Sequence, residues 1–478
     1  MGKREILMKR ARRRVKRVEG ITDSEKYLKK LCDQTFLSLW SYSNIFRDQG
    51  QTGDNRQGKE VCDLIVVFEN HIILFSDKEC EFPNSGDIEL DWIRWYKRAV
   101  EKSAKQIWGA ERWIKQFPTR LYLDRSCTQP FPLELPDPKQ AIFHRIVVAH
   151  GVSEKCKQVF GGSGSLMISP GIKGQMHKLR IAEGGRPFTV GHVDDKREFV
   201  HVLDDTSLTI VLNTMDTITD FVSYLEKKEK LIASGKLIAA AGEEDLLAYY
   251  LGELNENDEH DFIVPSDMDG IVIDEGFWEH FEKSPERKAQ INANKVSYSW
   301  DGLIETFSTH ILNDTQYFST AQEPKDSEKS IRFLAREPRM MRRMLAKMLL
   351  DLIRKSYENP TMRYSRVSIP TQEGDPYYVF LLLPHPRELF SYSEYREARR
   401  NLLEMHCMVV RYKFFDAKDI VGIATESGRG EYGSEDAIYF DGRIWNEQLD
   451  NEAKRIHEEM GLLSKTRMFR DSEKEYPV

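Results

Sequence analysis

The sequence predicts an α/β protein in which a mixed sheet flanked by helices is followed by a second, α+β domain. Two apolar runs rich in Val and Ile, residues 60–68 and 71–78, are separated by Glu69 and Asn70, which is typical of a hairpin buried in a sheet. Residues 90–117 then carry Trp, Ile and Ala at helical intervals and predict a helix that covers this sheet.

The other expected elements of the first half follow from the same patterns. A helix is expected over residues 23–46, before the hairpin. Beyond the covering helix we expect strands over residues 120–124, 141–150, 188–193, 199–203 and 208–213, then a helix over residues 217–233. We expect one sheet to begin at Glu60 and to run through these strands.

An acidic stretch, residues 252–269, is typical of a solvated linker and predicts a domain boundary near residue 262. In the second half we expect helices over residues 277–307, 330–356 and 392–405, and strands over residues 364–369, 377–383, 408–414 and 419–424. The predicted organisation is a basic arm over residues 1–20, a first domain over 21–262 and a second over 263–478. The second domain shows no cluster of acids with a lysine, and no role is assigned to it.

Length and composition limit the class of protein. A chain of 478 residues is too long for one ordinary core, and 40% hydrophobic with 31% charged residues is the composition of a globular protein. No apolar run has the length of a membrane span, and the amino terminus lacks the apolar segment of a secretory signal, so we expect a cytoplasmic protein without a membrane partner. The six cysteines are scattered, which favours free thiols, and no His or Cys spacing indicates structural zinc.

The amino-terminal segment is strongly basic although the whole chain carries a net charge of −7. Such a run is usually a solvated face or a flexible tail. It could instead be an arm that binds the phosphates of a nucleic acid. The candidate nucleic-acid-binding residues are Arg10, Arg12, Arg13, Arg14, Lys16 and Arg17.

Charged residues at the ends of the predicted hairpin need a physical reason, because an unpaired charge at the edge of a core is costly. Asp63 and Lys78 could form an ion pair across the strands. Alternatively, Asp63 and Asp77 would be metal ligands, since two neighbouring carboxylates favour a hard cation such as Mg²⁺ or Mn²⁺. The ion would activate water for attack on a phosphodiester, Lys78 would orient or deprotonate that water, and Glu60 would be an outer ligand.

The order of these parts resembles the PD-(D/E)xK nuclease superfamily, whose fold is restriction-endonuclease-like. In that family an acid on one strand and an acid-x-lysine on the next meet at a split in the sheet, after a helix that can supply a glutamate. Here Asp63 matches the first acid, Lys78 the lysine, and Glu25 lies on the preceding helix.

The resemblance implies a metal-dependent endonuclease, with Asp63, Asp77, Lys78 and Glu60 as catalytic residues and Mg²⁺ or Mn²⁺ as the cofactor. It implies DNA as the partner and a prokaryotic role in restriction, repair or anti-phage defence. A homo-oligomer or a partner protein of a defence system is left open.

The spacing departs from the family at one position, because Ser76 stands where the second acid is expected. A bulge could turn Asp77 inward. The frame could instead be acid-x-acid, with Glu79 in place of Lys78, or Glu60 could complete the site. A further alternative is an inactive nuclease fold that acts as a scaffold or as a nucleic-acid-binding interaction protein.

Overall fold

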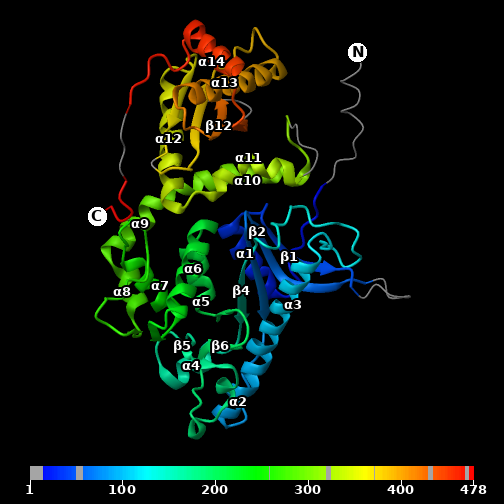
Figure 1. Ribbon diagram of the computed structural model, residues 1–478, viewed down its shortest axis with the longest axis vertical. Helices are drawn as coiled ribbons and strands as arrows, with labels where there is room; N and C mark the ends of the chain where they lie inside the picture. The colour runs from blue at the N-terminus through cyan, green and yellow to red at the C-terminus, as the bar shows by residue number, and fades with distance from the viewer. Residues whose placement is uncertain are drawn as a thin grey trace. The chain divides into compact units, whose positions relative to one another are not determined.

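The computed structural model describes residues 14–49, 57–257, 259–318, 324–370, 372–428, 434–468 and 473–477. The chain forms two compact units (Figure 1), the first comprising Met1–Lys288 with Ser308–Thr315 and the second Ala289–Phe307 with Gln316–Val478. The division falls after Lys288 rather than near residue 262, because residues 271–273 form a strand of a sheet in the first unit.

The first unit contains a five-stranded mixed sheet in the order β1-β2-β3-β4-β7. β1, β2 and β3 are antiparallel neighbours, whereas β4 and β7 continue the sheet in parallel with β3. The strands are β1 (Ser41–Arg47), β2 (Lys59–Phe68), β3 (His71–Lys78), β4 (Ile142–Ala149) and β7 (His201–Leu203). The predicted hairpin and the predicted strand over residues 141–150 are therefore confirmed.

Helices cover both faces of this sheet. Helices α2 (Ile88–Tyr96) and α3 (Lys102–Gln116) are joined by a π-helical turn and confirm the predicted covering helix; α3 runs beside the strands in Figure 1. On that face, Glu111 of α3 binds Arg145 of β4 at 2.5 and 2.8 Å. On the other face, Phe36 of α1 (Asp23–Phe36) lies 6.2 Å from Phe75 of β3 between ring centroids.

The predicted helix over residues 23–46 is too long. α1 begins at the Thr22 capping box and ends at Phe36, where Leu37 takes a left-handed φ of 63°. Residues 41–47 then form β1, which pairs with β2. The apolar residues that suggested more helix are buried in a strand instead, since a buried run of this length does not distinguish the two structures.

The strands expected to extend the sheet belong in part to a second sheet, of order β6-β5-β8-β9. Its strands are β5 (Met167–Lys173), β6 (Thr189–His192), β8 (Leu237–Ala240) and β9 (Ile271–Ile273), and the helices of this region are α4 (Ser153–Phe160), α5 (Ser207–Thr214), α6 (Ile218–Ala233), α7 (Glu243–Gly252) and α8 (Phe277–Lys283). Helix α6 was predicted, but the predicted strand over residues 208–213 is helix α5. Asp204 accepts hydrogen bonds from the backbone N–H groups of Thr206 and Ser207 at the start of α5, and Leu208, Val211 and Leu212 are buried at helical spacing.

The second unit is built around a four-stranded sheet of order β10-β11-β12-β13. From residue 285 on, the elements are α9 (Pro285–Asn294), α10 (Tyr298–Asn313), α11 (Pro324–Arg336), α12 (Arg339–Glu358), β10 (Tyr364–Ser368), β11 (Tyr377–Leu383), α13 (Tyr392–Lys413), β12 (Asp419–Glu426), β13 (Glu435–Asp441) and α14 (Glu447–Met460). β11 and β12 are parallel and α13 connects them.

Three predictions for the second half of the chain differ from the structure. The expected helix over residues 277–307 is divided into α8, α9 and the first part of α10. The expected helix over residues 330–356 is divided at Pro338, which caps α12. The expected strand over residues 408–414 is the last part of α13, where Leu403, Cys407 and Val410 are buried at helical spacing. Within the described ranges, no helix combines the length and the apolar character that crossing a membrane requires.

Candidate active site at the fork of the first sheet

The candidate site lies where the first sheet splits. β2 and β3 pair from the hairpin turn only as far as Leu64 opposite Phe75. Beyond that point β2 continues beside β1 to Lys59, while β3 continues beside β4 to Lys78. Two neighbouring strands thus lose their mutual hydrogen bonds but keep their outer partners. Asp63 is the first residue of β2 beyond this fork.

Asp63 partly replaces the missing strand pairing. Its Oδ2 accepts a hydrogen bond from the backbone N–H of Asp77 at 2.7 Å. The pKa of Asp63 is raised to about 7, chiefly by burial; the hydrogen bond from Asp77 opposes this, and the charges of Glu60 and Glu25 add to it. A buried carboxylate beside other carboxylates favours the binding of a cation.

The raised pKa predicts a measurable effect on stability. Without a divalent ion, the free energy of unfolding should fall as pH rises from about 4 to 7, because Asp63 must ionise at pH 7 in the folded state and already ionises near 3.8 in the unfolded state. Asp63→Asn should remove this loss and stabilise the metal-free protein by up to about 4 kcal/mol at pH 8. Urea unfolding at pH 5 and pH 8 would measure it, and an equal pH dependence in both proteins would contradict it.

The carboxylate of Asp77 has no exposed surface. Its Oδ1 lies 2.7 Å from Nε2 of His150. Its Oδ2 is buried and has no hydrogen-bond partner within the described part of the chain. Such an oxygen is unfavourable unless water or a cation binds it. Oδ2 is therefore the atom through which Asp77 would hold a metal ion.

His150 connects Asp77 to a third acid. Its Nδ1 lies 2.9 Å from Oδ1 of Asp205, whose Oδ2 accepts a hydrogen bond from the backbone of Gly151. Burial acts to lower the pKa of His150, but the bonds to Asp205 and Asp77 outweigh it and raise that pKa to about 10. At neutral pH the ring is an imidazolium between two carboxylates.

The fold explains this convergence. Asp77 lies near the carboxyl end of β3, His150 directly follows β4, and Asp205 comes two residues after β7. Since these three strands are parallel neighbours, their carboxyl ends meet at one edge of the sheet.

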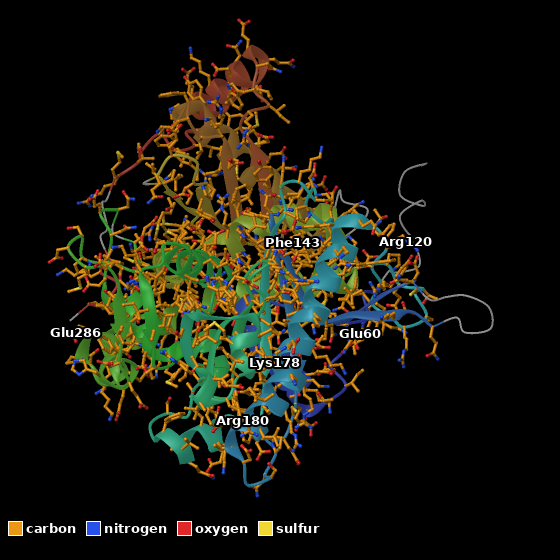
Figure 2. The ribbon with its side chains drawn as sticks, turned by 60° about the horizontal axis from the view of Figure 1, so that its bottom comes forward. Glu60, Arg120, Phe143, Lys178, Arg180 and Glu286 are labelled. Carbon is orange, nitrogen blue, oxygen red and sulfur yellow. The ribbon has the colours of Figure 1, made fainter. Side chains whose placement is uncertain are left out.

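Glu60 lies on the part of β2 that leads to the fork and is labelled in Figure 2. Its Oε1 accepts a hydrogen bond from Nδ2 of Asn44 at 2.9 Å, and the same amide lies 3.3 Å from Glu25. Burial raises the pKa of Glu60, and the bond from Asn44 lowers it. Asn44 therefore holds two acids together on the Asp63 side of the fork.

Lys78 and Asp77 project from opposite faces of β3. β3 keeps an unbroken register beside β4, with Leu74 opposite Arg145 and Lys78 opposite Ala149. Because side chains alternate along a regular strand, Lys78 faces the α3 side with Arg145, whereas Asp77 faces the α1 side with Phe75. On β2, Leu64 lies opposite Phe75, so the next residue, Asp63, leaves its strand on the α3 side and reaches the Asp77 backbone N–H across the fork. The proposed bulge that would bring Asp77 and Lys78 to one face is absent from the β3–β4 pairing.

Ser76 and Glu79, the residues on either side of Asp77 and Lys78, lie in different environments. Ser76 lies on the same face as Lys78 and is 1% exposed, so it does not take the place of Asp77. Glu79 directly follows β3 and is exposed. An acid-x-acid frame from Asp77 to Glu79 stays a prediction. The ion pair that Asp63 could form with Lys78 is not among the contacts of Asp63, which bonds to the Asp77 backbone instead.

Part of the basic arm lies within the described residues. Arg14 and Lys16 are exposed, whereas Arg10, Arg12 and Arg13 lie outside the described residues. Arg17 is different, because its guanidinium forms an ion pair with Asp33 and donates to the Ser41 carbonyl at 2.8 Å. Arg17 therefore helps to fix the start of the fold.

The potential donors at the fork are all oxygen atoms. The donors are carboxylate oxygens, which Mg²⁺ and Mn²⁺ prefer, and Oδ2 of Asp77 lacks a partner among the described residues. Asp63 and Asp77 would hold the ion, with water completing its shell. Elsewhere in the described ranges, three potential metal ligands have ligand atoms that lie within 4.8 Å of one another. These residues are His71, His144 and Glu226.

The sequence alone did not identify His150 and Asp205 as site residues. His150 and Asp205 each follow a buried strand closely in the sequence. This position indicates a shared site only when the strands are known to be parallel neighbours. Comparison with protein-family models, curated proteins and solved structures found no match to this chain.

Proposed function

We propose that the first unit hydrolyses phosphodiester bonds of nucleic acid, with DNA as the substrate, using a divalent cation held by Asp63 and Asp77. The observation that carries the proposal is the fork in the sheet, with these two acids at its opening. The carboxylates at the fork would give a cation the oxygen ligands that it requires.

The order of elements supports a restriction-endonuclease-like fold for this unit. Helix α1 with Glu25 precedes three antiparallel strands, Asp63 and Asp77 occur on the second and third, and the covering helices α2 and α3 follow. This is the order on which the resemblance to PD-(D/E)xK nucleases rests. We propose that Asp77, one position later than the family pattern, supplies the second acid.

Each residue has a distinct part in the proposed reaction. When bound, the divalent ion would activate water and stabilise the charge on the phosphate. Asp63 and Oδ2 of Asp77 would hold it. His150 and Asp205 fix Oδ1 of Asp77 and so orient the free oxygen. Glu60, with its raised pKa, would accept the proton of the attacking water.

A second candidate is a non-catalytic protein that uses the same fold as a scaffold. The observation in its favour is that the Asp77 carboxylate is fully buried and already bonded to His150, while Lys78 lies on the opposite face. In that case the acid–histidine–acid chain would only stabilise the edge of the sheet.

A cleavage assay separates the two candidates. Supercoiled plasmid, linear duplex and RNA would each be incubated with the full chain in Mg²⁺, Mn²⁺, Ca²⁺ or EDTA. We expect cleavage of DNA with Mg²⁺ or Mn²⁺, and binding without turnover with Ca²⁺. Cleavage that persists in EDTA, or no cleavage with any ion, would contradict the proposed function.

The basic arm makes a separate prediction. Deleting residues 1–13 should weaken DNA binding mainly at low salt, because each lost phosphate contact reduces the slope of log K against log salt by about 0.9. The deletion leaves Arg17 and its ion pair with Asp33 in place. Fluorescence anisotropy over a range of salt concentrations would measure the slope. An unchanged slope would mean that the arm does not contact phosphates.

A further inference from the structure

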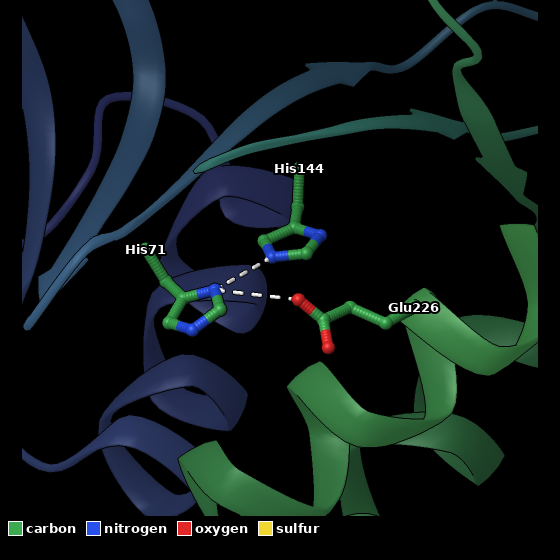
Figure 3. Close-up of side chains that lie close together, drawn as sticks. All are labelled: His71, His144 and Glu226. Carbon is green, nitrogen blue, oxygen red and sulfur yellow. Dashed lines mark hydrogen bonds and ion pairs between the residues drawn. The ribbon is translucent and has the colours of Figure 1, made fainter. Parts of the chain in front are cut away.

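A second group of potential metal ligands lies near the opposite end of the first sheet. Figure 3 shows His71, His144 and Glu226 pointing toward one another. Nδ1 of His71 is 3.1 Å from Nε2 of His144 and 4.0 Å from Oε1 of Glu226. One potential ligand atom from each residue lies within 4.8 Å of the others.

Three different elements bring these side chains together. His71 is the first residue of β3, His144 is the third residue of β4, and Glu226 lies on α6. Asp77 is six residues farther along β3 than His71, which corresponds to roughly 20 Å. The histidine group is therefore separate from the fork.

The surroundings of both imidazoles disfavour the charged ring. Burial lowers the pKa of His144 to about 3, and the neighbouring ring of His71 lowers it too. Burial likewise lowers the pKa of His71, although Glu226 opposes this.

We propose that His71, His144 and Glu226 bind a divalent transition-metal ion of the zinc class through Nδ1, Nε2 and a carboxylate oxygen. In a tetrahedral zinc site with bonds of about 2.0–2.1 Å, neighbouring ligand atoms lie about 3.3 Å apart. Nδ1 of His71 lies 3.1 Å from Nε2 of His144 and 4.0 Å from Oε1 of Glu226, and all three ligand atoms lie within 4.8 Å of one another, so the Glu226 carboxylate would move closer to the rings on binding an ion.

A plain hydrogen bond between the two rings explains less. It would use one nitrogen of each ring and give Glu226 no part, since 4.0 Å is too long for a hydrogen bond to His71. An ion would instead use both lone pairs and the carboxylate together. It would also connect α6 to two strands of the sheet.

The group is open on one side. The side chains of His71 and Glu226 are 22% and 37% exposed, whereas His144 is 1% exposed. An ion could therefore enter from solvent and keep a water ligand. The mixture of nitrogen and oxygen donors selects zinc-class ions over Mg²⁺, whereas the all-oxygen fork has the opposite preference. The inference thus does not depend on the proposed nuclease activity.

Metal titration of the full chain tests the site. After removal of metals by a chelator, Zn²⁺ would be titrated against a chromophoric competitor with Mg²⁺ in excess, so that the fork is occupied. We expect one tightly bound equivalent of Zn²⁺. Co²⁺ should give the visible absorption of a four-coordinate ion.

Two partly exposed positions provide the variants. His71→Ala and Glu226→Gln should each weaken Zn²⁺ binding at least about 100-fold and abolish the cobalt absorption. His192→Ala is the matched control, because His192 is a half-buried histidine on β6, in the other sheet of the same unit. It should bind Zn²⁺ as the unchanged protein does. Circular dichroism would verify that each variant is folded.

Two results would overturn the inference. One is the absence of a stoichiometric equivalent at micromolar Zn²⁺. The other is an unchanged affinity in both His71→Ala and Glu226→Gln, which would place the bound ion elsewhere. If the protein binds Zn²⁺ as expected but does not cleave DNA, the proposed nuclease site at the fork is contradicted and the zinc site is not.

Discussion

Asp63→Asn and Asp77→Asn are each expected to reduce magnesium-dependent DNA cleavage by at least about 1,000-fold while the protein stays folded. Each change replaces a charged ligand by a neutral one of the same shape, so the cation is lost but little packing is removed. In Asp63→Asn, the amide oxygen of the new side chain would still accept the hydrogen bond from the Asp77 backbone. Single-turnover cleavage over a range of Mg²⁺ concentrations, with unfolding curves of the same samples, would measure both effects.

Lys78→Ala is the matched control for this experiment. Lys78 is adjacent to Asp77 in sequence but faces the α3 side of the sheet. Because the proposed site is centred on Oδ2 of Asp77, which faces the α1 side, we expect loss of Lys78 to change the cleavage rate by no more than a few-fold. A large loss of rate in Lys78→Ala together with active Asp77→Asn would mean that the site lies on the α3 face, which Lys78 shares with Asp63.

His150→Ala is expected to raise the Mg²⁺ concentration required for half-maximal cleavage by about 10- to 100-fold. His150 touches Asp77 rather than the substrate, so it acts as a positioning residue. Without the imidazolium, Asp77 can rotate and is no longer held with Oδ2 free. Cleavage at saturating Mg²⁺ should recover more than cleavage at low Mg²⁺.

Asp205→Asn provides the graded comparison. It keeps a hydrogen-bond acceptor for His150 and for the backbone of Gly151 but loses the charge. Its Mg²⁺ requirement should lie between those of the unchanged protein and His150→Ala. If His150→Ala and Asp205→Asn both lower the maximal rate without changing the Mg²⁺ dependence, the hydrogen bonds that connect Asp77, His150 and Asp205 do not position a metal ligand.

The sequence was sufficient to place Asp63 and Asp77 on neighbouring strands of one hairpin. The reason is local, since the apolar runs on either side of Glu69 and Asn70 leave a single pairing. It was also sufficient for the covering helix, whose aromatic residues recur at helical intervals. Both features depend on contacts between residues close in the chain.

The partners of Asp77 could not be found in this way. His150 and Asp205 reach it only because β4 and β7 align in parallel beside β3, and no local pattern fixes that alignment. The orientation of Lys78 likewise depends on whether β3 is regular or bulged, which the residues themselves do not determine. Where an apolar run was equally suited to helix and strand, as in residues 208–213, tertiary packing decided.

The hydrogen bond from the Asp77 backbone to Asp63 has a consequence for solvent exchange. In a regular hairpin that amide would be protected by a backbone carbonyl of the neighbouring strand. At the fork its acceptor is an ionisable side chain instead. Deuterium uptake at this one amide would therefore report the charge and position of Asp63, so a spectroscopist could follow occupation of the fork without a substrate.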